Sequence, residues 1–227
     1  MILTLFQEHQ NRWKDCTDCS LHASRIKVVL ARGKLPCDIL FTGEAPGESE
    51  NVIGRPFIGP AGKLLDDIVG QATKGLGVCV ECGFVRSGSA EEMACKLAHK
   101  ESEGVPEIGT PRIAYTNLIA CIPRNEEDGG KLEVPSPESV EACSLRLAEL
   151  VQIADPKLIV CVGSESKDWH DSKRKGNVSK LFHRKIPTFD MVHPAYLLRL
   201  NVAQRGLAIQ RCIVTLASVF DDYKEMV

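Results

Sequence analysis

A chain of 227 residues with 44% hydrophobic residues is long and apolar enough to bury a sizeable core, which excludes a wholly disordered protein. Its net charge of −2 gives no support for a nucleic-acid partner held by bulk charge, so such a partner would require a local basic patch. No apolar run approaches the roughly 20 residues of a membrane-spanning helix.

The start of the chain has neither the basic segment nor the cleavage site of a signal peptide, so we expect a cytoplasmic protein. The chain contains 10 cysteines, which is many for a reducing compartment. In such a compartment, cysteines are more often metal ligands than disulfides.

The first part of the chain predicts a helix, a cysteine pair, a strand and a second helix. Residues 3–13 are compatible with a helix, and Cys16 and Cys19 follow them as a CxxC pair. Such a pair is typical of redox, zinc and iron–sulfur sites, although two surface thiols would give the same pattern. Residues 37–42 predict a buried strand, and residues 63–72 predict a helix.

The loop between this strand and this helix has the sequence FTGEAPGESENVIGRPFIGPAG, over residues 41–62. It is dense in glycine and proline and carries several carboxylates. A long loop that leads from a strand to a helix N-terminus is a common ligand site in α/β proteins. We therefore expect a binding site here.

The rest of the chain continues to alternate strands with helices. Ser136 and Pro137 predict the start of a helix, as its N-cap and its first residue. The further predicted strands are residues 113–119, 158–162 and 186–192, and the further predicted helices are residues 136–154, 167–170 and 205–223. This pattern predicts an α/β fold, a three-layer α/β/α sandwich with a central, mostly parallel four-stranded sheet.

Polar and aromatic side chains follow the ends of these predicted strands. They are Glu44, Glu50 and Phe57 after the first strand, Asn117 in the second and His193 after the last. Because parallel strands end at one edge of their sheet, the loops that follow them converge there. We expect these side chains to line a common site.

Two segments, GEAPGESENVIGRPFIGPAG and VHPAYLLR, resemble the signature motifs of the family 4 uracil-DNA glycosylases. Together with the CxxC pair, TNLIAC and the helix that contains Cys143 resemble the iron–sulfur cysteines of that family. These motifs occur in the family's order, and the resemblance covers residues 16–199 apart from residues 74–110. It implies an enzyme that flips uracil out of DNA and hydrolyses its N-glycosidic bond, the first step of base excision repair.

The resemblance implies a [4Fe–4S] cluster whose ligands are Cys16, Cys19, Cys121 and Cys143. Thiolates suit this cluster because they are soft and anionic. The CxxC pair supplies two ligands from one turn, and the two single cysteines complete the cage from distant segments. We expect a structural role, in which the cluster pins the N-terminal segment to the loop after the second strand.

The resemblance also implies a uracil pocket. Phe57 resembles the aromatic residue that stacks on the flipped base, and Asn117 resembles the residue that reads the edge of that base. An amide offers one donor and one acceptor, which match uracil and reject cytosine. His193 resembles the residue beside uracil O2, where a positioned donor stabilises the charge that develops as the bond breaks.

Two acidic positions of the family match Glu44 and Glu50, and both are candidates for the catalytic group that activates water. Glu50 has two alternative roles, which are to stabilise the sugar cation or to exclude the methyl group of thymine. Better-known uracil glycosylases have an Asp where this substrate-binding loop has Ala45, and family 4 commonly has a small residue there. The segment GGKLEVPS lacks the histidine of a related cross-linking branch, so we expect no covalent trap.

Contact with DNA is expected just after His193. Leu197 and Leu198 are candidates for the apolar wedge that fills the gap left by a flipped base, and the alternative for either is packing within a helix. Arg199 ends the same motif and is a further candidate DNA contact. The basic run over residues 173–185 is either a phosphate contact or a solvated loop. We expect a monomer that binds uracil-containing DNA, single- or double-stranded.

Residues 74–110 are polar and rich in glycine, unlike their surroundings. They contain Cys79, Cys82, Cys95 and His99, in the spacing C-x2-C-x12-C-x3-H of a small zinc finger. We therefore expect a zinc-binding insertion within a single domain of residues 1–227. The alternative is a surface insert with incidental thiols.

Two other functions fit the same motifs. A non-catalytic DNA-binding accessory protein on this fold is favoured by the insertion and the negative net charge. A glycosylase for other deaminated bases would use the same pocket. The presence of Phe57, Asn117 and His193 favours an active uracil-DNA glycosylase.

Overall fold

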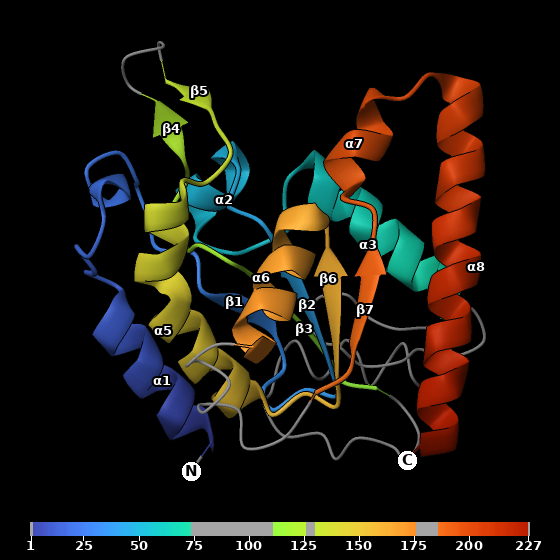
Figure 1. The fold of residues 1–227 in the computed structure, drawn as a ribbon, viewed down its shortest axis with the longest axis horizontal. Coiled ribbons are helices and arrows are strands. Elements are labelled where there is room, and N and C mark those ends of the chain that lie inside the picture. The colour runs from blue at the N-terminus through green and yellow to red at the C-terminus, as the bar shows by residue number, and fades with distance from the viewer. Residues whose placement is uncertain (1, 74–110, 126–129, 176–185, 227) are drawn as a thin grey trace.

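The computed structural model describes residues 2–73, 111–125, 130–175 and 186–226 (Figure 1). Cys79, Cys82, Cys95 and His99 lie outside these residues, so the zinc-binding insertion stays a prediction. Most of the basic run over residues 173–185 lies outside them as well. In the part of the chain that is described, no helix combines the length and the apolar character needed to cross a membrane.

Within these described residues, five strands form the central sheet, in the order β1-β3-β2-β6-β7. The sheet contains the four predicted parallel strands, β2 (Ile39–Gly43), β3 (Ile113–Asn117), β6 (Leu158–Val162) and β7 (Thr188–Met191). The fifth strand, β1 (Ala31–Gly33), pairs antiparallel with β3 at the edge of the sheet. The sequence does not predict β1 because its three residues are too few to show apolar alternation.

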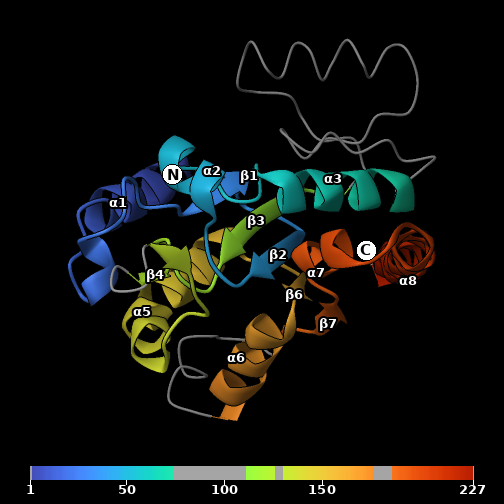
Figure 2. The ribbon, with the colours of Figure 1, turned by 90° about the horizontal axis from the view of Figure 1, so that it is seen from above.

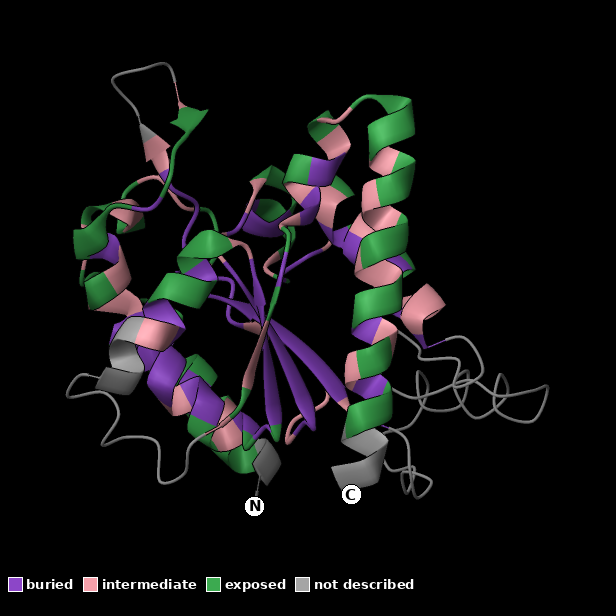
Figure 3. Ribbon diagram, turned by 45° about the vertical axis from the view of Figure 1, so that its right-hand side comes forward, coloured by how far each residue is buried: buried purple, intermediate pink, exposed green. Residues whose placement is uncertain are grey.

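Helices cover both faces of the sheet, which confirms the predicted three-layer sandwich (Figure 2). One face packs against α3 (Pro60–Ala72), α7 (Pro194–Arg199) and α8 (Val202–Met226). The other packs against α5 (Pro137–Ala154) and α6 (Ser164–Lys175), and α1 (Ile2–Trp13) contacts α5 from outside. Because both faces are covered, β2, β3 and β6 are buried throughout (Figure 3).

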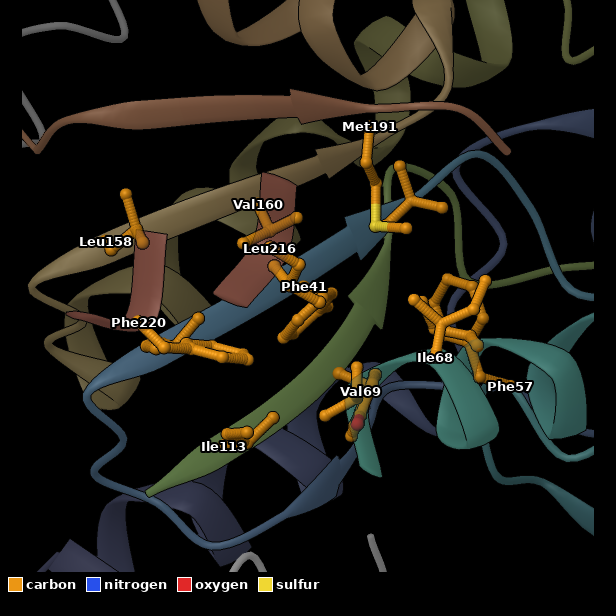
Figure 4. Packing of buried hydrophobic residues seen from close by; sticks show 14 of the residues in the cluster. Phe41, Phe57, Ile68, Val69, Ile113, Leu158, Val160, Met191, Leu216 and Phe220 are labelled. Carbon is orange, nitrogen blue, oxygen red and sulfur yellow. The ribbon is translucent and has the colours of Figure 1, made fainter. Parts of the chain in front are cut away.

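The larger core cluster lies between the sheet and the layer formed by α3, α7 and α8 (Figure 4). Phe41, Ile113 and Val160 of the sheet cluster there with Ile68 of α3 and Phe220 of α8. Each such side chain contributes about 1.5–3 kcal/mol when it is fully buried. This core holds rigid the strands whose carboxyl ends carry the predicted site residues.

Several short elements surround that edge of the sheet. α2 (Glu48–Ile53) lies within the long loop after β2, and β4 (Arg124–Asn125) pairs with β5 (Lys131–Leu132) as a small hairpin. The 3-10 helix η1 (Ser20–His22) follows the CxxC pair. None of these was predicted, because each is too short to show a periodic apolar pattern.

The start of α5 follows its sequence signal. The Oγ atom of Ser136 accepts a hydrogen bond from the Ser139 backbone amide at 3.2 Å, and Pro137 occupies the first turn, as predicted. This cap fixes where the helix begins. Further along α5, Cys143 and Arg146 line a small cavity.

Candidate active site

A cavity of about 970 Å³ opens at the carboxyl edge of the parallel strands. The loops after β2, β3, β6 and β7 meet there because parallel strands all end at the same edge. The predicted site residues that line the cavity are Glu44, Ala45, Glu50, Phe57, Asn117, His193 and Arg199. The structure thus brings together side chains from both halves of the chain.

Phe57 forms one wall of this cavity on a strained backbone. Its φ angle is 55°, in the left-handed region that residues with a Cβ atom rarely adopt. Its ring is buried, with its centroid 5.9 Å from that of Tyr115. Gly62 makes this turn possible, since a Cβ atom there would lie 2.0 Å from the Phe57 carbonyl oxygen. Strain that the surrounding structure maintains is typical of functional sites.

Glu50 holds the loop that carries Phe57. Its Oε1 atom accepts hydrogen bonds from the backbone amides of Ile58 at 2.9 Å and Gly59 at 2.7 Å. The Glu50 side chain is buried on α2, where water does not satisfy these amides. This loop-positioning role escapes sequence reasoning, because only the folded loop brings the two amides to the carboxylate.

Asn117 ends β3 directly opposite Gly43 of β2, and its side chain is buried. A Cβ atom on Gly43 would lie 2.6 Å from Asn117 Oδ1 and 2.4 Å from Phe57 Cζ. Gly43 is therefore the residue that lets Asn117 and Phe57 approach each other in one cavity.

His193 is both the N-cap of α7 and a wall of the cavity. Its Nδ1 atom accepts a hydrogen bond from the Ala195 backbone amide at 3.2 Å, so in the neutral ring the hydrogen is on Nε2. Burial lowers the pKa of His193, and the nearby Arg199 guanidinium lowers it further. Near neutral pH the ring is therefore an uncharged hydrogen-bond donor.

Glu44 is half-buried in the lining of the cavity. Burial raises the pKa of the Glu44 carboxyl, and the Glu165 carboxylate at the start of α6 raises it further. A carboxylate with a raised pKa is a better proton acceptor. Ala45 follows it with no side-chain group that could transfer a proton.

Residues that follow β6 and residues of β7 also line the cavity and were not predicted. Gly163 has a φ angle of 96° just after β6, and a Cβ atom there would lie 3.2 Å from His193 Cβ. Lys167 of α6 and Asp190 of β7 form an ion pair at 2.9 Å across the lining. The rule that selects Asn117, a position at the carboxyl end of a parallel strand, would also have selected Gly163 and Asp190.

On α7, the wedge prediction is wrong for Leu197. Its side chain is completely buried and belongs to the core cluster beneath the helix, so the alternative of helix packing applies. Leu198 is half-buried, and Arg199 is exposed beside the cavity. Both remain predicted DNA contacts.

A second, small cavity is lined by Cys16, Cys19, Cys121 and Cys143, from the segment after α1, the loop after β3 and α5. Arg25 lies beside it, with its Nη1 atom 3.7 Å from Cys121 Sγ. Burial raises the pKa of the Cys121 thiol to about 11 and also raises the pKa of Cys16.

Among the residues that the structure describes, no three His, Cys, Asp or Glu side chains converge on a position for a single metal ion. An iron–sulfur cluster has a different geometry, because its thiolate ligands surround a cavity instead of meeting at one ion. Four cysteines from three segments around one cavity fit that geometry.

Comparison with known proteins agrees with the motifs. The sequence model of the uracil DNA glycosylase superfamily matches residues 31–216. A Type-4 uracil-DNA glycosylase from Thermotoga maritima is 30% identical over 197 residues, which are 83% of this chain and 80% of the relative. Those from Sulfurisphaera tokodaii and Archaeoglobus fulgidus are 29% and 27% identical over 195 residues, which are 81% of this chain and 71% and 78% of the relatives.

The family match spans well over half of the chain and includes both of its signature motifs. The relatives are matched over most of their own length as well. The resemblance that the motifs carry is confirmed, and this chain belongs to the uracil DNA glycosylase superfamily.

Proposed function

We propose that this chain is a uracil-DNA glycosylase that flips uracil out of DNA and hydrolyses its N-glycosidic bond, which initiates base excision repair. The observation that carries the proposal is the meeting of Phe57, Asn117 and His193 in one cavity, from three separate segments. Relatives named Type-4 uracil-DNA glycosylase support the same activity.

The base is recognised by its face and by its edge. The buried ring of Phe57 offers a surface on which a flipped base stacks. The Asn117 amide offers one donor to uracil O4 and one acceptor to N3–H. Cytosine presents the opposite pattern, so an amide held in this orientation rejects it. Gly43 keeps both side chains close enough to contact the same base.

His193 assists the departure of the base. When the bond between C1′ and N1 breaks, its electron pair stays on uracil and negative charge develops on O2. The Nε2–H group of His193 donates a hydrogen bond to that oxygen, and the bond at Nδ1 orients the ring. A donor positioned in this way contributes about 10²–10³-fold to the rate.

Glu44 activates the water. The water oxygen bonds to C1′, and the proton that it loses passes to the Glu44 carboxylate. The raised pKa of Glu44 suits it to accept that proton. Glu50 is less suited, because one of its carboxylate oxygens is already bound to two loop amides.

A [4Fe–4S] cluster is the cofactor that the second cavity fits, with Cys16, Cys19, Cys121 and Cys143 as its ligands. When bound, the cluster supplies a cross-link between the segment after α1, the loop after β3 and α5. It takes no part in cleaving the glycosidic bond. Arg25 favours the thiolate form of Cys121, because its guanidinium lies beside the sulfur.

DNA contact and zinc binding belong to other parts of the chain. Leu198 and Arg199 contact DNA beside the mouth of the cavity, where Arg199 is exposed.

Residues 74–110 form a zinc-binding insertion within the single domain. This proposal rests on the spacing of their cysteines and histidine alone. Zinc analysis of the intact chain and of a variant that lacks residues 74–110 tests this insertion.

A gel assay for abasic sites tests the activity, on oligonucleotides that contain one uracil in single- or double-stranded DNA. Wild-type protein should convert the uracil to an abasic site. Asn117→Ala should lower the rate by roughly tenfold or more, because O4 and N3–H of the flipped uracil lose the amide that pairs with them. Leu207→Ala is the matched control, since Leu207 is an exposed residue of α8 outside the cavity lining.

Other outcomes separate the alternative functions. Tight DNA binding with no abasic product would favour the non-catalytic accessory protein. Cleavage of hypoxanthine-containing DNA without cleavage of uracil-containing DNA would favour a glycosylase for other deaminated bases.

A further inference from the structure

Arg146 places a buried guanidinium between the cysteine cavity and the base pocket. It belongs to α5, where it lies one turn after Cys143. Its side chain is 1% exposed and lines the cysteine cavity. Such burial is rare for an arginine unless the charge is compensated.

The guanidinium of Arg146 binds three consecutive residues at the carboxyl end of β3. Its Nη2 atom donates hydrogen bonds to the backbone carbonyls of Asn117 at 2.7 Å and Leu118 at 2.6 Å. Its Nη1 atom donates to Thr116 Oγ1 at 3.2 Å. The planar fork of arginine suits several fixed acceptors at once, so Arg146 fixes the main chain from which the Asn117 amide projects.

The positive charge of Arg146 has no acidic partner in the described part of the chain. Glu149, one turn later on α5, accepts hydrogen bonds from Arg12 and Trp13 instead. His9 is uncharged near neutral pH, because burial and then the Arg146 charge lower its pKa to about 4. Within the same described residues, the Nε atom of Arg146 has no hydrogen-bond partner. A lone buried charge is strongly unfavourable, so an anion should compensate it.

We propose that Arg146 is the counter-ion of the iron–sulfur cluster and the positioning residue that links the cluster to Asn117. This inference rests on the proposed function and its cofactor. Four thiolates give the cluster a net negative charge, which the guanidinium compensates from the wall of the cavity. The same guanidinium holds the main chain of Asn117. The cluster therefore supports uracil recognition without contacting the base.

Removing the charge tests the first half of the proposal. Arg146→Met should shift the reduction potential of the cluster to more negative values, because a nearby positive charge favours the added electron. It should also speed the release of iron to a chelator. Arg112→Met is the matched control. Arg112 pairs with Asp38 at the opposite end of β3, so its replacement should leave the reduction potential of the cluster unchanged. A wild-type potential and iron-release rate in Arg146→Met would overturn the counter-ion role.

A variant that keeps the positive charge of Arg146 but lacks its planar guanidinium tests the positioning of Asn117. Arg146→Lys should retain a potential near that of the wild type, yet excise uracil roughly tenfold more slowly, because an ammonium cannot hold all three acceptors. Excision at the wild-type rate would overturn the positioning role. Arg146→Gln replaces Arg146→Met in the first test if the methionine variant does not fold.

Different measurements decide the uracil-excising activity and the role of Arg146. If the wild-type protein excises no uracil, the proposed function fails, while the potentials of the wild type and Arg146→Met still decide the counter-ion role. If the wild-type protein binds no iron, both the cofactor and this inference fall, and the excision assay on the wild type still decides the activity.

Discussion

Glu44 and Glu50 lie in one loop, yet their different surroundings give them different roles. Glu50 is buried, and one of its carboxylate oxygens accepts hydrogen bonds from the backbone amides of Ile58 and Gly59. Glu44 is half-buried, and its pKa is raised by burial and then by Glu165. At this scale, the environment of each carboxylate decides which one holds the loop and which one accepts a proton.

Glu44 should give the excision rate an acid limb. Its base form is the ionised carboxylate, and a raised pKa means that this form is lost as pH falls through a value above the usual Glu pKa of about 4.3. Glu44→Gln should remove this limb and lower the plateau rate by roughly 10²–10⁴-fold. Single-turnover rates from pH 4 to 8 provide the measurement.

The stability of the same variant is the control. Because burial disfavours the charged form, Glu44→Gln removes an unfavourable group at neutral pH, and its melting temperature should equal or exceed that of the wild type. A variant that loses activity only because it unfolds would show the opposite change.

His193 combines two functions that one substitution can separate. His193→Asn keeps a side chain that caps a helix but is too short to place a donor where Nε2 lies. The variant should melt within a few degrees of the wild type and excise uracil about 10²–10³-fold more slowly. Equal rates for the two proteins would mean that the donor at uracil O2 is another group.

At the scale of elements, the pocket depends on how closely β2 and β3 approach at their carboxyl ends. Gly43 pairs with Asn117 in parallel register, and the side chains of Phe57 and Asn117 both lie against the position that a Cβ atom on Gly43 would take. Gly62 at the start of α3 accommodates the positive φ angle of Phe57. The strand, the loop and the helix start therefore form one unit.

Gly43→Ala should impair uracil excision without unfolding the sheet. The added methyl group would lie 2.4 Å from Phe57 Cζ and 2.6 Å from Asn117 Oδ1, so both side chains must move. We expect kcat/KM for uracil-containing DNA to fall about 10²-fold, as for a misplaced positioning group. Gly70→Ala is the matched control: a Cβ atom there meets nothing within 4 Å on α3, so activity should stay and stability should rise by roughly 0.5–1 kcal/mol.

For the whole molecule, the sequence predicts the parts that depend on periodicity and on the order of strands. The parallel strands and the shared edge that holds Phe57, Asn117 and His193 follow from apolar runs and strand ends. Contacts between distant segments are not contained in such patterns. The burial of Leu197 and the hydrogen bonds of Arg146 are of this kind, because each depends on which helix face meets the sheet.

The cluster ties three distant segments together, so its loss should affect the whole molecule. Cys143→Ala removes the α5 ligand and should abolish iron binding and the visible absorbance of the cluster. Without this cross-link, the segment after α1 should exchange its backbone amides with deuterium faster, and the melting temperature should fall. Cys212→Ala is the control, because Cys212 lies on α8 outside this cavity and should leave the iron content unchanged. If Cys143→Ala instead retains a full complement of iron and the wild-type melting temperature, the four cysteines do not form one cluster site. The anion that compensates the charge of Arg146 would then be a group other than this cluster.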